Sequence, residues 1–167
     1  MSKTDDNLKE AFAGESQAKQ KYLAFAKKSD KEGLPAIARL FRAAAAAETV
    51  HAQNHAGAMG IIVGTLDNLE AAAAGEAAEF REMYPGFIAQ AEQEGNAKAK
   101  TTFDYANQVE QIHHALYSKA IETLGKGQDL PETEMFVCRG CGNTVEGEAP
   151  DKCPICGAPK SWFMRIE

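Results

Sequence analysis

Apolar residues recur every three or four positions through most of the chain, and interruptions of this pattern divide it into four segments. The period predicts helices over about residues 6–31, 35–58, 66–94 and 96–124. Gly33, Gly60 and Gly95 lie in the gaps between these segments. Pro85 falls inside the third segment and is expected to break or kink it after Tyr84, because proline cannot donate to the helical ladder. We expect an all-α four-helix bundle.

The pattern changes after the fourth helical segment. Residues 125–134 are expected to form a linker, and residues 135–167 are rich in Gly, Pro and Cys and show no helical period. A segment this short cannot build an adequate apolar core. We therefore expect loops and short strands that are held together by something other than a core.

The core-facing stripes of all four predicted helices contain glutamate, and two of them also contain histidine. These residues are Glu15, Glu48, His51, Glu76, Glu79, Glu110 and His113. Burying unpaired carboxylates is costly, and no Lys or Arg occupies the stripes. Two metal ions of charge two or three would nearly balance five glutamates. The stripes therefore predict a binuclear metal site.

The spacing of these residues supports metal binding. Residues three apart share a helix face, so Glu48 with His51, and Glu110 with His113, each present an oxygen and a nitrogen donor together. Glutamates from two helices and Glu-x-x-His from the other two form the donor set of ferritin-like di-iron proteins. Glu79 is one carboxylate more than this set requires. Any single member could be a solvated surface residue, but the whole set in stripe register favours a metal site.

The cysteines form a second cluster, Cys138-x-x-Cys141 and Cys153-x-x-Cys156, with eleven residues between the pairs. This spacing is typical of tetrahedral thiolate coordination. Zinc and iron fit it equally well, and a structural zinc ribbon is the more frequent interpretation of the segment alone. A glycine follows each pair, and we expect it to adopt positive φ and to direct its N–H at sulfur.

Charge and hydropathy exclude several classes of partner. The net charge is −6, and the acidic excess lies before Met135, which argues against nucleic acid. No stretch approaches the roughly 18 apolar residues that would cross a membrane. The polar start, residues 1–7, does not support a cleavable signal. Cysteines at metal-binding spacing suit a reducing compartment, so we expect a cytoplasmic location.

Six stretches carry a more specific signal. They are Phe12-Ala-Gly-Glu-Ser-Gln, Glu48-Thr-Val-His51, Gly75-Glu-Ala-Ala-Glu-Phe, Glu82-Met-Tyr-Pro, Glu110-Gln-Ile-His113 and Cys153-Pro-Ile-Cys-Gly-Ala-Pro-Lys. Together they resemble the rubrerythrin family over essentially the whole chain. The resemblance implies a ferritin-like di-iron four-helix bundle over residues 1–124, followed by the linker and a small rubredoxin-like metal-bound β/loop domain over residues 135–167.

The resemblance also implies a role for each donor. Glu48 and Glu110 would bridge two irons. Glu15 and Glu76 would be terminal ligands, and His113 would bind one iron. The other iron would exchange between His51 when reduced and Glu79 when oxidised. Tyr22 and Tyr84 match tyrosines that hydrogen-bond ligand carboxylates, although either could simply fill the core. The expected catalytic residues are His51, Glu79, Tyr22 and Tyr84. A third iron, or zinc in isolated protein, would bind Cys138, Cys141, Cys153 and Cys156.

The implied activity is that of a non-haem di-iron peroxidase, which would reduce hydrogen peroxide to water in protection against oxidative stress. Electrons would arrive through the tetrathiolate iron, supplied by a separate flavoprotein reductase that uses NAD(P)H. Two alternatives stay open. One is a ferroxidase or iron-storage protein of the same bundle class, and the other is a zinc-ribbon interaction module on a structural helical bundle.

The connection between the second and third helices bears on assembly. Ferritin-like bundles need one long crossover so that these helices run parallel. The seven residues Met59–Thr65 reach about 23 Å, whereas the 24-residue helix before them is about 36 Å long. We therefore expect a domain-swapped homodimer, in which the first helix pair of one chain packs on the second pair of another. A simple up-down-up-down monomer is the alternative.

Overall fold

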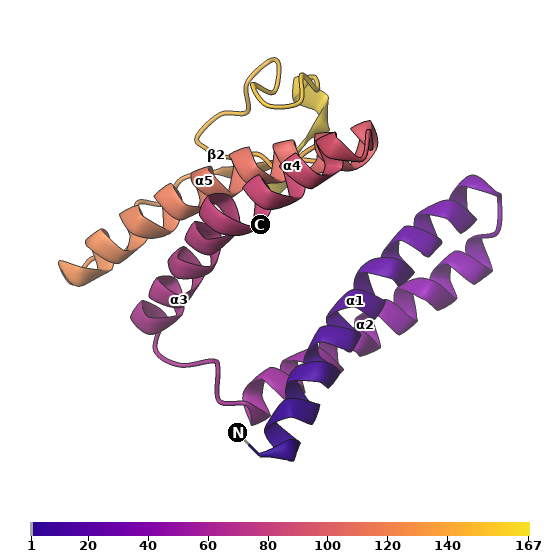
Figure 1. The fold of residues 1–167 in the computed structure, drawn as a ribbon, viewed down its shortest axis with the longest axis horizontal. Helices are drawn as coiled ribbons and strands as arrows, with labels where there is room; N and C mark the ends of the chain where they lie inside the picture. The colour runs from indigo at the N-terminus through magenta and orange to yellow at the C-terminus, as the bar shows by residue number, and fades with distance from the viewer. Residues whose placement is uncertain (1) are drawn as a thin grey trace. The chain divides into compact units, whose positions relative to one another are not determined.

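The computed structural model describes residues 2–167, which divide into two units after Val63 (Figure 1). Met1, the first residue of the expected bundle domain, lies outside the described residues. The first unit is a hairpin of two long helices, α1 (Lys3–Lys31) and α2 (Pro35–Ala58). The Ser2 hydroxyl accepts from the N–H of Asp5, which caps the start of α1. Gly33, at φ 74°, makes the turn between the helices.

Small residues line the contact between α1 and α2, which lets the two backbones approach closely. The buried positions are Ala26, Ser29, Ala38, Ala45, Ala52 and Ala56. Larger apolar residues stay outside this seam: Leu40 is 68% exposed and Val50 is 54% exposed. The hairpin therefore carries an apolar surface that its own two helices do not cover.

The second unit begins at Gly64 and contains four consecutive helical elements. They are α3 (Thr65–Ala78), the π-helical turn η1 (Glu79–Met83), α4 (Tyr84–Gln93) and α5 (Ala97–Gly125). Both α3 and α4 pack on α5. The helices lie where the apolar period predicts them, with ends that differ by a few residues.

Of the break or kink expected after Tyr84, the break is absent. The chain stays helical through this point, because the N–H of Tyr84 donates to the carbonyl of Glu79, five residues back, in a π-turn. Pro85 then lies in the first turn of α4, where its missing N–H costs no helical hydrogen bond. The π-turn therefore accommodates the proline without ending the helix.

The end of the second unit is a small antiparallel sheet of order β2-β1-β3. Its elements are β1 (Met135–Cys138), β2 (Thr144–Glu146), the 3₁₀ turn η2 (Lys160–Trp162) and β3 (Phe163–Ile166). Cys138 and Cys153 are buried in its centre beside Phe163. The strand β2 lies against α5, where Lys119 Nζ contacts a Glu146 carboxylate oxygen at 2.7 Å.

Within the described residues, no helix combines the length and the apolar character that crossing a membrane requires.

Candidate metal centres

The α1–α2 hairpin brings three of the expected metal ligands together. Glu15 comes from α1, while Glu48 and His51 come from one face of α2. His51 Nδ1 lies 2.8 Å from Glu48 Oε2 and 3.9 Å from Glu15 Oε1. The donor atoms of all three lie within 4.8 Å of one another. We call these three residues the first triad.

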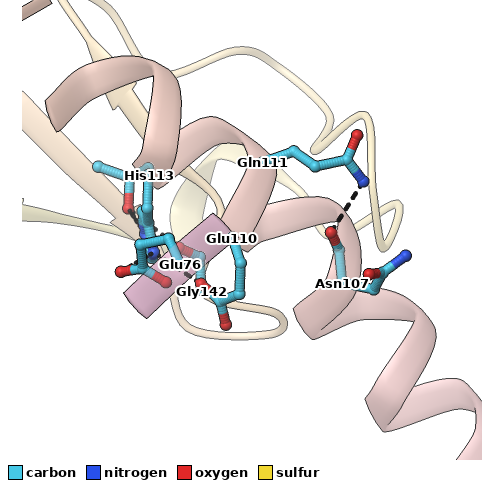
Figure 2. Close-up of polar contacts among 7 residues, drawn as sticks. Glu76, Asn107, Glu110, Gln111, His113 and Gly142 are labelled. Atoms are coloured by element: carbon cyan, nitrogen blue, oxygen red, sulfur yellow. Dashed lines mark hydrogen bonds and ion pairs between the residues drawn. The ribbon is translucent and has the colours of Figure 1, made fainter. Parts of the chain in front are cut away.

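The second unit repeats this arrangement. Glu76 comes from α3, while Glu110 and His113 come from one face of α5 (Figure 2). His113 Nδ1 lies 2.8 Å from Glu110 Oε2 and 3.6 Å from Glu76 Oε1. These three residues form the second triad, whose donor atoms also lie within 4.8 Å of one another.

Crowding of the carboxylates in the second triad changes their chemistry. Burial raises the pKa of Glu76, and the negative charge of Glu110 raises it further. Burial also raises the pKa of the Tyr84 phenol, with the charges of the neighbouring glutamates, Glu79 first, adding to the effect. The ion pairs of Glu76 and Glu110 among the described residues are with His113, so a cation at this triad would be stabilised by the two carboxylates.

The two helix pairs repeat each other along the sequence. Four matched pairs of positions are each 62 residues apart: Tyr22 and Tyr84, Phe25 and Phe87, Phe41 and Phe103, and Glu48 and Glu110. Glu15 and Glu76, however, are 61 residues apart. The second pair thus has one additional residue between its glutamate and its tyrosine, and the π-turn η1 accommodates this residue.

Glu79 does not belong to the second triad. It begins η1, half-buried, and its charge acts on the Tyr84 phenol. The corresponding position of the first helix pair, three residues after Glu15, is Ala18. Glu79 is therefore the carboxylate that makes the two halves unequal.

Both expected tyrosines lie in matching aromatic clusters. The Tyr22 ring lies 6.3 Å from the rings of Phe25 and Phe41. The Tyr84 ring lies 6.3 Å from Phe87 and 6.2 Å from Phe103. Packing accounts for both rings, and at Tyr84 burial and then the charges of Glu79, Glu110 and Glu76 raise the pKa of the phenol.

The four cysteines converge at the centre of the domain that contains β1, β2 and β3, which we call the sheet domain. Cys138 Sγ lies 3.7 Å from Cys156 Sγ, and Cys141 Sγ lies 3.6 Å from Cys153 Sγ. A tetrahedral metal with bonds of about 2.3 Å to sulfur requires sulfur atoms about 3.8 Å apart. The four thiols therefore have the separation that one tetrahedral ion needs.

Backbone and side-chain donors surround the sulfur atoms. At Cys153 burial raises the pKa, but the N–H groups of Cys156 and Ile155 outweigh it and bring the pKa to about 7. The Asn143 side-chain amide also donates to Cys153 Sγ, at 3.7 Å. The sequence contains no spacing rule that would reveal this donor.

The glycines after the cysteine pairs confirm one expectation and contradict another. Gly142 has φ 88° and Gly157 has φ 75°, as expected. Their N–H groups, however, donate to the carbonyl oxygens of Cys138 and Cys153 and not to sulfur. Each of these turns closes on the first cysteine of its pair. The residue after the first of these glycines, Asn143, therefore donates its backbone N–H to the sulfur of Cys141.

The donor sets fit the metals that the sequence predicts. In each triad, imidazole Nδ1 and a carboxylate oxygen lie 2.8 Å apart, close to the roughly 3 Å between adjacent ligands of a metal with bonds of about 2.1 Å. Oxygen and nitrogen donors suit iron, and the four thiols suit iron or zinc.

Comparisons with known proteins identify the family. The family model for rubrerythrin matches residues 6–121, and the model for the rubrerythrin rubredoxin-like domain matches residues 136–164. Nigerythrin of Nitratidesulfovibrio vulgaris is 39% identical over 96% of this chain and 85% of its own. Rubrerythrin of Porphyromonas gingivalis is 37% identical over 97% of this chain and 89% of its own.

Solved structures give the same result. Nigerythrin in its mixed-valence state and in its fully reduced, all-ferrous state each align with a TM-score of 0.58 and 35% identity, over 99% of this chain and 88% of theirs. The predicted fold class, a ferritin-like helical body followed by a rubredoxin-like domain, is confirmed. The chain therefore belongs to the rubrerythrin family, whose members are oxidoreductases that carry a di-iron site and a rubredoxin-like iron site.

Proposed function

We propose that this protein is a peroxidase that reduces hydrogen peroxide to water at the di-iron site. The observation that supports this most directly is the contact between the two kinds of site within one unit. His113 of the second triad lies 2.9 Å, Nε2 to Oγ1, from Thr144, in the segment that follows Cys141. A one-electron site thus adjoins a carboxylate–histidine site, which suits repeated turnover better than iron storage.

The ligand roles are those that the family resemblance implies, and the two triads supply the residues for them. Glu48 and Glu110, the carboxylates 2.8 Å from each imidazole, would be the ligands shared by the two irons. Glu15 and Glu76 would be terminal ligands, and His113 would hold one iron permanently. When bound, the irons supply the two electrons that cleavage of the O–O bond consumes. The cleavage also consumes two protons, which the irons do not supply.

His51 and Glu79 would alternate as a ligand of the other iron, His51 in the reduced state and Glu79 in the oxidised state. The His51 side chain is 53% exposed, whereas that of His113 is 28% exposed. The more exposed imidazole is less restrained by its own chain, and Glu79 is a carboxylate whose matching position in the first helix pair is Ala18. Tyr84, beside the carboxylates, would donate a hydrogen bond to them, and Tyr22 would have the same role in the first pair.

We also propose that the di-iron site forms between two chains. Residues 59–64 connect α2 to α3 and reach about 20 Å at most, while α2, with 24 residues, is about 36 Å long. The connection also leaves Ile61, Ile62 and Val63 between 50% and 63% exposed, which favours a covering partner. A domain-swapped homodimer, with the first triad of one chain meeting the second triad of another, satisfies both observations.

A mixed dimer tests the swap directly. One chain carries Glu48→Ala and the other Glu110→Ala, and the two chains bear different affinity tags so that only the mixed dimer is purified. In a swapped dimer, one site receives both defects and the other receives none, so about half of the wild-type di-iron content returns. In an unswapped dimer each site keeps one defect, and recovery no greater than in either parent dimer would refute the swap.

Electrons would come from a flavoprotein reductase that uses NAD(P)H, and a cytoplasmic, reducing environment would keep the four thiols available.

Stopped-flow mixing of the prereduced protein tests the reaction itself. A peroxidase reoxidises far faster with hydrogen peroxide than with oxygen. Faster reoxidation by oxygen, with ferric iron retained or released, would instead support the alternative of a ferroxidase.

A further inference from the structure

The strand β2 places a hydroxyl group behind one of the metal-binding imidazoles. Thr144 Oγ1 lies 2.9 Å from His113 Nε2 and 3.1 Å from the carbonyl oxygen of Gly142. His113 Nδ1, on the other side of the ring, faces Glu110 and Glu76 (Figure 2). One ring nitrogen therefore points to the sheet domain and the other to the carboxylates.

The chemistry of these three groups decides where the protons lie. A carbonyl oxygen only accepts hydrogen bonds, and a threonine hydroxyl has one proton. Thr144 must therefore donate to Gly142, and its oxygen can then only accept from His113 Nε2–H. A neutral imidazole that carries its proton on Nε2 has a lone pair on Nδ1, the atom that faces the carboxylates.

We propose that Thr144 is a positioning residue that fixes His113 in the Nε2–H tautomer and so presents Nδ1 to the metal. With this tautomer, Nδ1 and Glu110 Oε2 face each other at 2.8 Å without a proton between them, an arrangement that a metal ion stabilises. The proposal concerns metal binding and does not depend on which reaction the di-iron site performs.

The position of Thr144 also joins the two metal sites through one short segment. Its neighbour Asn143 is buried and donates to Cys153 Sγ, whereas Thr144 faces His113. Consecutive residues of an extended segment point to opposite sides. In the segment that follows Cys141, the Asn143 side chain thus contacts the Cys153 sulfur, and the Thr144 side chain contacts the His113 imidazole.

Three variants test the role of the hydroxyl. Thr144→Val keeps the shape but removes the hydroxyl, Thr144→Ser keeps the hydroxyl, and Lys119→Met breaks the other contact between α5 and β2. The readout is the affinity of the di-iron site for ferrous iron, measured anaerobically by competition with a chelator. Loss of such a supporting contact weakens metal binding by about 10- to 100-fold.

We expect that loss for Thr144→Val only, with Thr144→Ser and Lys119→Met close to wild type. An unchanged affinity in Thr144→Val would overturn the proposal. An equal loss in Thr144→Ser or in Lys119→Met would do the same, because it would show that packing of β2 on α5 matters and the hydroxyl does not. Visible absorption of the ferric tetrathiolate site reports on folding of the sheet domain in each variant.

A second measurement needs no variant. In wild-type protein loaded with zinc, which is diamagnetic, nitrogen-15 spectra of the histidine rings should show the His113 proton on Nε2 and metal on Nδ1. The reverse assignment would contradict the proposal even if every variant failed to fold.

Discussion

His113 Nδ1 and Glu110 Oε2 lie 2.8 Å apart on one face of α5, with Glu76 Oε1 3.6 Å from the same nitrogen. Without metal, this group brings two carboxylates together in a place where burial already raises the pKa of Glu76. With metal, the same crowding supplies the negative charge that the ion needs. The arrangement therefore costs stability in the metal-free protein and contributes to it in the metal-bound protein.

Glu110→Gln should consequently have opposite effects on the two forms. Removing one charge should stabilise the metal-free protein by about 1 kcal/mol and should abolish iron binding at the di-iron site. Urea denaturation and iron analysis measure the two effects. Glu122→Gln is the matched control, since Glu122 is an exposed carboxylate on the same helix. A purely structural Glu110 would give a destabilised metal-free protein that still binds iron.

The raised pKa of Glu76 predicts a pH dependence of the metal-free protein. The folded state binds this proton more tightly than the unfolded chain does, so the stabilisation is complete below the ordinary value of 4.5 and is lost as pH rises through the raised pKa. From pH 4.5 upward, the free energy of unfolding of wild type should therefore fall relative to that of Glu76→Gln. A constant difference between the two proteins over this range would contradict the direction of the shift.

Cys138→Ser should separate the two metal sites. Cys138 is buried at the centre of the sheet domain, and its loss removes one of four thiolate ligands. Turnover coupled to NAD(P)H oxidation should stop, while the prereduced di-iron site should still react once with peroxide. If reactivity in a single turnover also disappeared, the proposed division of roles would be wrong.

Glu79→Ala should reproduce the first helix pair, where Ala18 occupies the matching position. We expect the diferrous protein to load normally, because both triads remain, and to lose iron over successive oxidation cycles for want of the additional carboxylate. Iron content after each cycle measures this loss. Glu70→Ala, at an exposed carboxylate of α3, should behave as wild type; iron retention by Glu79→Ala equal to that control would remove Glu79 from the mechanism.

Asn143→Leu should lower the reduction potential of the tetrathiolate iron. The amide of Asn143 donates to Cys153 Sγ, and hydrogen bonds to sulfur favour the reduced site, which carries more negative charge. Spectroelectrochemical titration measures the potential, and Gln108→Leu, an exposed amide on α5, serves as the control. A higher or unchanged potential in Asn143→Leu would show that this contact does not tune the site.

The sequence predicted the features that obey a regular spacing. The stripe positions of Glu48, His51, Glu110 and His113 follow from the helical period, and both triads form where that period places them. The two C-x-x-C pairs likewise predicted the tetrathiolate cluster. Local spacing is sufficient for the Glu-x-x-His pairs, which share one helix face, and for each C-x-x-C pair, which lies in one short loop.

Other features depend on contacts that no local pattern specifies. Thr144 and Asn143 gain their partners only when β2 packs on α5 and on the cysteines, and neither residue is unusual in the sequence.

The π-turn could have been found, because the 61-residue spacing of Glu15 and Glu76 differs from the 62-residue spacing of Glu48 and Glu110. Pro85 alone predicts a break or a kink, and the helix continues because the additional residue forms the π-turn before it.

Anomalous scattering at the iron and zinc edges, measured on crystals of natively purified protein, tests the central claim most directly. We expect two iron peaks among Glu15, Glu48, Glu76 and Glu110 and one metal peak among the four cysteines. A carboxylate region without metal, with Glu48 and Glu110 turned to water in an equally stable protein, would contradict it.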